Sequence, residues 1–253
     1  MGHFHRSLAL GRIAAARGHK VHILANTRFA PHIPWQNELG SGGSVTIIPH
    51  SASRDITAAA TAKWLAADDY DRLVVDTFPR GLAGELPELL PSIRIPKILV
   101  HRDLNSEYVT SHQLAETVKR FDLLLLPGED GPFAKEPTAL RTAPWLIRDA
   151  AELLPAPLAR RRICLDATDS RPVLVVCSTG QKEEETFYRE VAQALRAQAT
   201  SWCVRLASPL PRKGAFSCWP LLPLLPGVTA LIGAGGYNLV HEARSTGTPL
   251  LAF

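Results

Sequence analysis

One stretch decides the fold: Leu231-Ile-Gly-Ala-Gly-Gly-Tyr-Asn-Leu-Val-His-Glu-Ala-Arg-Ser-Thr-Gly-Thr-Pro-Leu-Leu-Ala-Phe253. It predicts a buried strand at 228–232, a glycine turn, a short helix and a second strand. Gly233, Gly235 and Gly236 allow the backbone to turn tightly and to approach a ligand without a Cβ in the way. The helix directs its free N–H groups and its positive dipole end at this turn, which makes an anion site.

A carboxylate lies on the second turn of the same helix. Glu242 is placed there to accept hydrogen bonds from ribose hydroxyls, and a phosphate cradle beside a ribose acceptor suggests a nucleotide diphosphate. Taken alone the signal is weak, because Gly-Ala-Gly-Gly is not the dinucleotide fingerprint. Glycines between a strand and a helix often serve only the turn, so both interpretations stay open at this point.

The composition is that of a soluble globular protein. The 253 residues suffice for one large or two ordinary domains, and the chain is 46% hydrophobic and 21% charged. No apolar run is long enough to span a bilayer, and no signal-peptide pattern follows Met1. The four cysteines are scattered, which indicates a reduced, cytoplasmic compartment and no structural zinc site. We therefore expect no bound metal.

The formal charge of +4 is mildly basic. The only tight basic run, Arg160-Arg161-Arg162, lies beside a proline-rich segment and has no interleaved aromatic residues. A solvated linker explains it better than a nucleic-acid patch, so we expect no nucleic-acid partner. The positive balance suits anionic substrates or an anionic membrane surface, which leaves peripheral membrane contact open.

Strand and helix signals alternate through the first half of the chain. Strands are predicted at 21–24, 44–48, 72–75, 96–100 and 123–126, and helices at 55–67 and 106–119. Such alternation predicts a parallel sheet covered by helices on both faces. Ligands of these folds bind outside the carboxyl ends of the strands. That rule places Gly2-His3, Asp76-Thr77 and His101-Arg102-Asp103 along one rim.

The pattern changes at about Pro132, where prolines become frequent. We predict a first Rossmann-like domain at 1–131, a linker at 132–171 and a second Rossmann-like domain at 172–253. The second domain begins with a strand at 172–177 and a small-residue turn, Ser178-Thr179-Gly180, before a helix at 183–197. Both halves carry such a loop into a helix. The prediction is an α/β protein with two domains that face each other across a cleft.

Three motifs together resemble GT-B glycosyltransferases, notably the MurG-like family 28 group. They are Gly2-His3-Phe-His-Arg6-Ser-Leu-Ala-Leu10 with Arg17-Gly18-His19, the run Asp76-Thr-Phe-Pro-Arg-Gly-Leu-Ala-Gly-Glu-Leu86, and Gly236-Tyr-Asn-Leu-Val-His-Glu242-Ala with Gly247-Thr-Pro-Leu-Leu. The last is the most specific, since it is similar to the donor-binding signature of that group. The resemblance implies metal-independent transfer of a sugar, expected to be a hexosamine, from a nucleotide-diphosphate sugar to an acceptor hydroxyl.

The resemblance also implies roles for single residues. His3 is the candidate catalytic base on the acceptor hydroxyl, since the reference pKa of histidine lies near neutral pH. A UDP-sugar is the favoured donor, the acceptor is unknown, and no cofactor is expected. Asp76, Arg102 and Asp103 are the expected acceptor-side residues. The expected donor-side residues are Ser178, Thr179, Gly180, Gly233, Gly235, Gly236, Asn238 and Glu242.

The chain departs from the family pattern at both ends. The strand and glycines expected before Gly2 are missing, and the chain stops at Phe253, before the loop that usually holds the donor sugar. We therefore expect a chain truncated at both ends. Two alternatives to the transferase remain, a nucleotide-sugar 2-epimerase of the same two-domain fold and a truncated, non-catalytic nucleotide-sugar-binding protein.

Several candidates have simpler explanations. His101-Arg-Asp-Leu104 matches the start of a kinase catalytic loop, but Tyr108 stands where the magnesium-binding Asn should be. A polar cluster at a strand end is the better interpretation. Asp76 is better explained as a turn or helix-capping residue ahead of Pro79, and His3 is explained equally well as a solvated histidine. The five tryptophans are expected to be packing residues.

Overall fold

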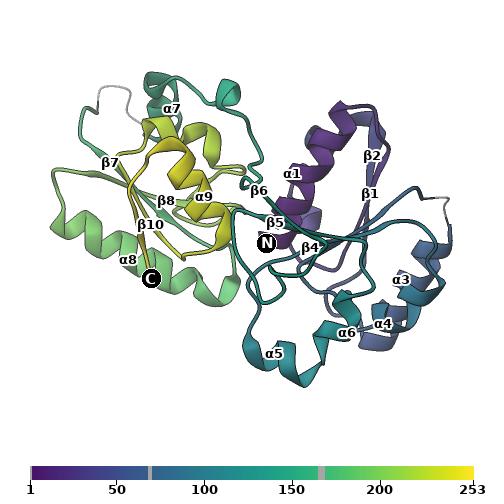
Figure 1. Cartoon of the computed structure of the whole chain (residues 1–253). Helices are drawn as coiled ribbons and strands as arrows, with labels where there is room; N and C mark the ends of the chain where they lie inside the picture. Colours follow the sequence, from purple (N-terminus) through teal and green to yellow (C-terminus); the bar gives the residue numbers. More distant parts are fainter. Residues whose placement is uncertain (1, 68–69, 165–168) are drawn as a thin grey trace. The chain divides into compact units, whose positions relative to one another are not determined.

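The computed structural model describes residues 2–67, 70–164 and 169–253 and divides into two compact units. The first unit consists of Met1–Ala9, His32–Pro34 and Leu146–Phe253, and the second of Leu10–Pro31 and Trp35–Trp145. Helix α1 (Gly2–Ala16) contributes its first residues to the first unit and the rest to the second. Figure 1 labels the elements.

The first unit contains a five-stranded sheet in which every neighbouring pair is parallel, in the order β11-β10-β7-β8-β9. The strand β7 has the sequence Val-Leu-Val-Val-Cys and is buried at all five positions, as an apolar central strand should be. The strands are β7 (Val173–Cys177), β8 (Cys203–Ser208), β9 (Phe216–Ser217), β10 (Ala230–Gly233) and β11 (Leu250–Ala252).

Helices cover this sheet through narrow apolar faces. The longest is α8, whose Tyr188 and Ala192 lie one turn apart and pack on Leu174, Val176 and Leu206 of the strands. The helical segments of the unit are η4 (Ala150–Glu152), α7 (Ala156–Ile163), η5 (Lys182–Glu184), α8 (Glu185–Gln198), η6 (Leu222–Gly227) and α9 (Tyr237–Thr246).

The second unit holds two parallel sheets, one with the order β1-β2 and one with the order β3-β4-β5-β6. Its strands are β1 (Val21–Ala25), β2 (Gly43–Ile47), β3 (Leu73–Asp76), β4 (Lys97–Val100), β5 (Leu123–Pro127) and β6 (Ala139–Thr142). Its helices are η1 (Ala30–His32), α2 (Gln36–Leu39), η2 (Gly40–Gly42), α3 (Arg54–Ala67), α4 (Leu86–Leu89), η3 (Leu90–Ser92), α5 (Ser106–Ser111) and α6 (Leu114–Val118).

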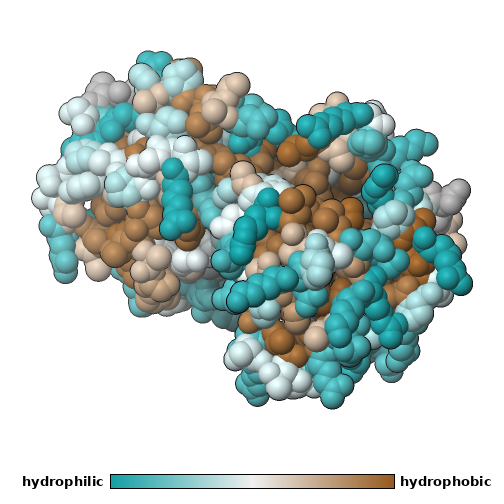
Figure 2. Space-filling model, in the orientation of Figure 1, coloured by the Kyte–Doolittle hydropathy of each residue, from teal (hydrophilic) through white to brown (hydrophobic). Residues whose placement is uncertain are grey.

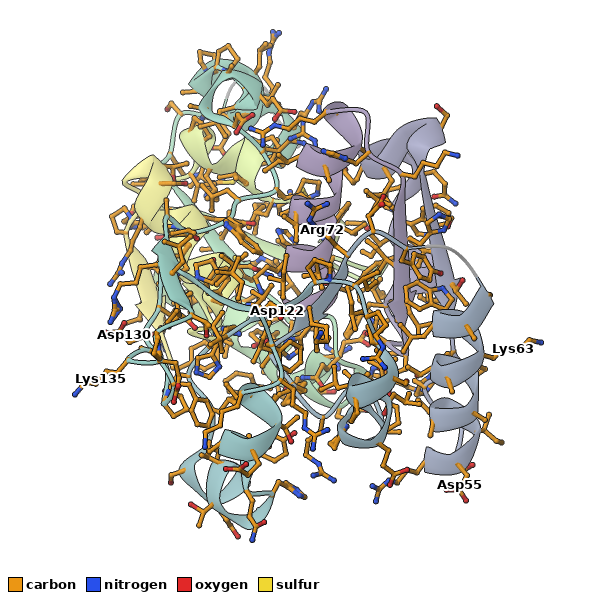
Figure 3. All side chains as sticks on the ribbon, turned by 45° about the vertical axis from the view of Figure 1, so that its right-hand side comes forward. Asp55, Lys63, Arg72, Asp122, Asp130 and Lys135 are labelled. Atoms are coloured by element: carbon orange, nitrogen blue, oxygen red, sulfur yellow. The ribbon has the colours of Figure 1, made fainter. Side chains whose placement is uncertain are left out.

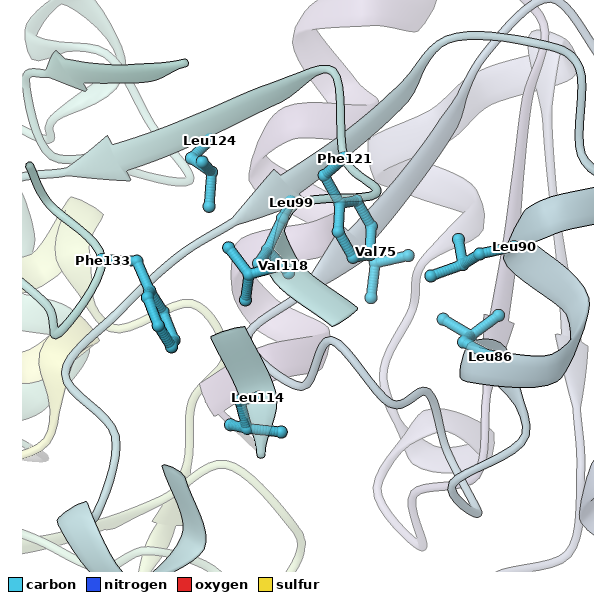
Figure 4. Packing of buried hydrophobic residues seen from close by; sticks show 9 residues of the cluster. All are labelled: Val75, Leu86, Leu90, Leu99, Leu114, Val118, Phe121, Leu124 and Phe133. Atoms are coloured by element: carbon cyan, nitrogen blue, oxygen red, sulfur yellow. The ribbon is translucent and has the colours of Figure 1, made fainter. Parts of the chain in front are cut away.

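The core of the second unit lies between the four-stranded sheet and the short helices (Figure 4). Leu99 and Leu124 come from neighbouring strands, and Leu114 and Val118 come from α6 and lie four residues apart. All four side chains are almost fully buried. Burial of each such side chain stabilises a fold by about 1.5–3 kcal/mol relative to leaving it exposed.

Charged side chains cover the outside. On α3, Asp55 and Lys63 are exposed and project outward, whereas Thr57 and Thr61 are buried (Figure 3). On the face shown in Figure 2, hydrophilic side chains alternate with smaller apolar areas. Among the helices of the described ranges, none is long and apolar enough to cross a membrane.

Two segments differ from the sequence prediction. The helix expected at 106–119 is interrupted between α5 and α6, because Gln113 takes a left-handed conformation with φ of 48°. The linker expected at 132–171 contains β6, η4 and α7. The frequent prolines of this segment suggested an irregular linker, but two of them are compatible with a helix. Pro155 is the N-cap residue of α7 and Pro157 lies in the first turn of α7, where a missing N–H costs no helical hydrogen bond.

The predicted strand, glycine turn, helix and strand at the end of the chain are confirmed as β10, α9 and β11. Helix α9 ends just before Gly247, which has φ of 68° and whose backbone N–H donates to the carbonyls of Ala243 and Arg244. A glycine adopts this left-handed conformation without a Cβ clash.

Candidate functional site

Two loops of the first unit leave the sheet at the same edge. Strands β7 and β10 are parallel neighbours, and their last residues, Cys177 and Gly233, are paired in register. Ser178 and Ala234, which follow them, therefore start side by side at the carboxyl edge of the sheet. A Cβ on Gly233 would lie 3.1 Å from the Cβ of Cys177 and 2.9 Å from the Leu239 side chain. This glycine is required by the packing of the strands.

The first of these loops, Ser178–Gly180, is held by its own hydrogen bonds. The backbone N–H of Gly180 donates to Ser178 Oγ over 3.1 Å, and the hydroxyl of Thr179 donates to the Glu184 carboxylate. Gly180 has φ of 80°, a value that disfavours any residue with a Cβ. The Arg212 guanidinium donates to the Gly180 carbonyl over 3.2 Å. The turn is therefore preformed.

The second loop leads into the N-terminus of α9. Gly236 is the N-cap residue, and no side chain caps the helix or places an acidic group in its first turn. A Cβ on Gly236 would meet no atom within 4 Å. The fold thus leaves open space beside Gly236, at the helix end that carries the first backbone N–H groups and the positive end of the helix dipole. This arrangement suits an anion.

Glu242 lies on α9 as predicted, but its carboxylate is in contact with another part of the same unit. The residue is only 4% exposed, and its Oε1 lies 3.2 Å from Nε2 of His5, which is equally buried. The indole N–H of Trp219 reaches His5 Nδ1 over 3.2 Å. An indole N–H can only donate, so Nδ1 must accept, and the imidazole proton is assigned to Nε2, facing Glu242. Glu242 Oε1 nevertheless makes no hydrogen bond within the described residues, so a buried carboxylate oxygen is left for a further donor.

The start of α1 lies against the start of α9. Gly2 and His3 form the first turn of α1, so His3 is helical where the family resemblance implies a loop, and its side chain is exposed. The Asn238 side chain donates to the Gly2 carbonyl over 3.3 Å. The Arg6 guanidinium lies 5.0 Å from the centre of the Tyr237 ring, within cation–π range. The structure thus brings His3 and the predicted donor-side residues into one region of the first unit.

The acceptor-side residues belong to the second unit. Asp76 and Val100 are paired at the ends of β3 and β4, so Asp76-Thr77 and the run that includes Arg102 and Asp103 leave that sheet at one edge. Gly2 and His3, which were expected on the same rim, belong to the first unit instead. Thr77 is buried and has φ of 66°, an uncommon conformation for a β-branched residue. Arg102 donates two hydrogen bonds, of 2.7 and 2.9 Å, to the Glu129 carboxylate.

A pocket of about 810 Å³ lies beside this edge, after β4 and β5. Asp103 lines it, together with Glu129 and Asp130 and the apolar side chains of Leu104 and Val109. Arg102 pairs with Glu129 at the same place. The lining of the pocket therefore combines carboxylate groups with apolar side chains.

His101 precedes this run and is a core residue. It is fully buried, and its Nε2 accepts a hydrogen bond of 3.2 Å from the Phe133 backbone N–H. Burial lowers the pKa of His101 to about 4, although the nearby Asp103 carboxylate acts in the opposite direction. The imidazole is therefore neutral near pH 7 and helps to hold the loop that follows β5.

Sequence reasoning missed three residues of the first unit. His5 contacts Glu242, and Trp219 contacts His5. Arg212 contacts the Ser178–Gly180 loop. Trp219 was expected only to pack, and His5 and Arg212 were not assigned. The histidine two positions after His3 is a signal in the sequence, but the contact joins residues more than 230 positions apart. No local pattern predicts such a pair.

Comparisons with known proteins give the fold. No protein-family model matches the sequence, and a search of curated proteins gives no match. Among solved structures, the Streptomyces sp. SF2575 glycosyltransferase SsfS6 complexed with thymidine diphosphate is similar, with 16% identity, a TM-score of 0.56, and coverage of 98% of this chain and 76% of that one.

Two further structures are similar to this chain. Medicago truncatula UGT71G1 complexed with UDP-glucose has 14% identity and a TM-score of 0.64, over 100% of this chain and 77% of that one. The spinosyn rhamnosyltransferase SpnG has 18% identity and a TM-score of 0.55, over 99% and 77%. The chain has the α/β fold with parallel sheets of GT-B glycosyltransferases.

Proposed function

We propose that this chain is a glycosyltransferase that moves a sugar from a nucleotide-diphosphate sugar to an acceptor hydroxyl. One observation carries the proposal: the register of β7 with β10 brings the Ser178–Gly180 loop and the N-terminus of α9 to one sheet edge. Backbone N–H groups and a helix dipole at such an edge favour a diphosphate. The fold shared with SsfS6 and UGT71G1 supports the same donor class.

The proposed donor is a UDP-sugar. UGT71G1 was solved with UDP-glucose and SsfS6 with thymidine diphosphate, so a pyrimidine diphosphate fits both. The choice of a hexosamine rests only on the resemblance of 236–251 to the MurG-like group. In the proposed reaction the N-terminus of α9 neutralises the departing diphosphate, a role that a divalent cation fills in other transferases.

Ribose binding in this proposal uses a buried oxygen of Glu242. Oε1 lies 3.2 Å from His5 Nε2 but makes no hydrogen bond within the described residues, so a ribose hydroxyl can donate to it. Such a bond would satisfy a buried acceptor, which favours binding. The His5 imidazole keeps the indole N–H of Trp219 as its partner.

The proposed acceptor side is the carboxyl edge of the four-stranded sheet. Asp76, Arg102 and Asp103 leave the sheet there, and Asp103 lines the 810 Å³ pocket. His3 is the proposed base, because its side chain is exposed and histidine is the side chain that most often acts as a general base.

Product analysis tests the function. The full chain is incubated with UDP-N-acetylhexosamines and UDP-glucose, with and without a panel of hydroxyl acceptors, and free UDP and sugar products are quantified. Acceptor-dependent release of UDP with a glycosylated product supports the transferase. Epimerised donor without UDP release contradicts it, and so does tight UDP binding with no product across the panel.

Glu242→Gln tests the donor site. We expect it to weaken UDP binding by about 1–3 kcal/mol, because a charge-assisted hydrogen bond to ribose is lost, as measured by calorimetric titration. Glu38→Gln is the matched control, since Glu38 is also a buried carboxylate, 3.6 Å from the Arg12 side chain. Equal loss of affinity in both variants would assign the effect to general destabilisation and remove Glu242 from the site.

His3→Ala tests the base. Turnover should fall by at least 100-fold while the affinity for UDP stays within about twofold, since a general base acts on the chemical step. His19→Ala, an exposed histidine after the end of α1, is the control. Equal loss of turnover and of affinity in the His3 variant argues against a base.

A further inference from the structure

Two thiols of the first unit are in direct contact away from the candidate site. The Sγ atoms of Cys164 and Cys203 lie 3.3 Å apart, and both residues are buried. Cys164 follows the last residue of α7, and Cys203 is the first residue of β8. The contact therefore joins a helix end to a strand start that are 39 positions apart in the sequence.

We propose that Cys164 and Cys203 form a reversible disulfide and are an oxidation site of this protein. A disulfide needs an Sγ–Sγ distance of about 2.05 Å, so the two atoms must approach by roughly 1.3 Å. Small side-chain rotations supply such a movement. The proposal is independent of the nucleotide and of the transferase activity.

The chemistry balances with hydrogen peroxide as the oxidant. One thiolate attacks a peroxide oxygen and becomes a sulfenic acid, with release of water after proton transfer. The second sulfur then attacks the sulfenic sulfur, the S–S bond forms, and a second water leaves. Two thiols and one peroxide thus give one disulfide and two waters. A dithiol reductant returns the disulfide to two thiols by thiol–disulfide exchange.

The surroundings of the pair make this oxidation slow. Burial raises the pKa of the Cys203 thiol, and the contacts with Cys164 and with the Asp169 carboxylate act in the same direction. Asp169 is itself held by Arg171, whose guanidinium donates to it over 2.8 Å. Little thiolate is therefore present on Cys203 near pH 7, and thiolate is the reactive form. We expect formation over hours rather than seconds.

The position of the pair predicts what the disulfide changes. Cys203 is paired with Val173, the first residue of β7, whereas Ser178–Gly180 follows the last residue of β7. The cross-link thus lies at the end of the strands opposite to the candidate donor loops. It closes a loop in the unfolded chain and should stabilise the first unit without changing UDP binding.

Oxidation and thiol mapping test the proposal. The full chain is treated with hydrogen peroxide at pH 8, free thiols are alkylated in denaturant, and linked peptides are identified by mass spectrometry. We expect Cys164 joined to Cys203, a loss of two hydrogen atoms, a melting temperature higher by about 5 °C, and reversal by dithiothreitol. Cys164→Ser and Cys203→Ser should each abolish the linkage, the mass loss and the rise in melting temperature. Cys177→Ser and Cys218→Ser, at the other two cysteines, should keep them.

Two outcomes overturn the proposal. One is a linkage that involves Cys177 or Cys218, or sulfinic acid at Cys164 or Cys203 in place of a linkage. The other is four free thiols after a day of exposure to excess peroxide. Because two separate serine variants probe the same bond, failure of one to fold leaves the other as the test.

Discussion

Both units have parallel sheets, but the loops at the carboxyl ends of their strands contain different kinds of residues. In the first unit the loops are Ser178–Gly180 and the glycine-rich run before α9, so backbone N–H groups dominate. In the second unit the loops carry charged side chains that are already paired: Arg102 pairs with Glu129, and Asp130 pairs with Arg141 of β6. The start of α9 has no side-chain cap and leaves backbone donors open for an anion, whereas the charged side chains of the second unit already have partners.

This difference indicates which unit is suited to bind a diphosphate. A helix of ten residues, uncapped by any side chain, begins at the edge of the first unit. The helix that follows β4 in the second unit, α5, has six residues, and the side chain of its N-cap residue, Asn105, accepts a hydrogen bond from the Glu107 N–H. That cap occupies the position that an anion would take. We therefore place the donor in the first unit.

The largest expected effect concerns the buried histidine of the second unit. The pKa of His101 is lowered to about 4 from an unfolded value of 6.5, so the unfolded chain binds the proton more tightly. Stability is fully present above pH 6.5 and falls as the pH decreases toward 4, by on the order of 1–3 kcal/mol.

Urea unfolding between pH 7 and 4 measures this loss. His101→Gln keeps an acceptor for the Phe133 N–H and should flatten the pH dependence, and His19→Ala, at an exposed histidine, should not. The affinity of the His101 variant for UDP should stay unchanged at pH 7. If the pH dependence of the unfolding free energy stays the same in His101→Gln, or if this variant loses UDP binding, the different roles given to the two units would be contradicted.

A charge at the start of α9 should have the next largest effect. Gly236→Asp places a carboxylate where no atom lies within 4 Å of the new Cβ, and Asp is a good N-cap residue. We expect unchanged or slightly higher stability, and UDP affinity weaker by about 1–2 kcal/mol, because two anions compete for one helix end. Gly236→Ser adds a neutral cap of similar size and serves as the control. Equal affinities of the two variants in calorimetric titration would exclude a diphosphate at this helix.

The smallest effect is expected at the paired side chains of the second unit. Arg102→Met removes a partly buried ion pair with Glu129, and ion pairs that solvent still reaches contribute about 0–1 kcal/mol to stability. UDP affinity should not change, whereas acceptor-dependent turnover should fall if this edge binds the acceptor. Glu129→Gln sharpens the result, since it removes the same pair and keeps Arg102. A UDP affinity that drops in either variant would contradict the assignment of the two edges.

The sequence predicts local elements well wherever short-range patterns control them. The apolar run of β10, the glycines before α9 and the glycine after it are local signals, and the structure confirms all three elements. The break at Gln113 and the half-exposed β6 within a proline-rich segment were missed. Neither feature is marked by a local apolar periodicity in the sequence. Tertiary contacts, rather than the intrinsic propensity of the residues, determine them.

The candidate site is less predictable than the fold. Glycine loops and the position of Glu242 on its helix follow from spacing, but the partner of the Glu242 carboxylate does not. His5 and Trp219 reach it from segments that are distant in the sequence. Burial of such a polar cluster is a property of the packed chain, and only coordinates reveal it.

The most direct test of the donor assignment is hydrogen–deuterium exchange of the full chain with and without UDP. We predict that UDP protects backbone amides in residues 178–181 and 234–239 of the first unit. Residues 102–110 and 129–132, at the edge of the second unit, should exchange at the same rate in both samples. Protection confined to that second edge, or no protection at saturating UDP, would contradict the assignment.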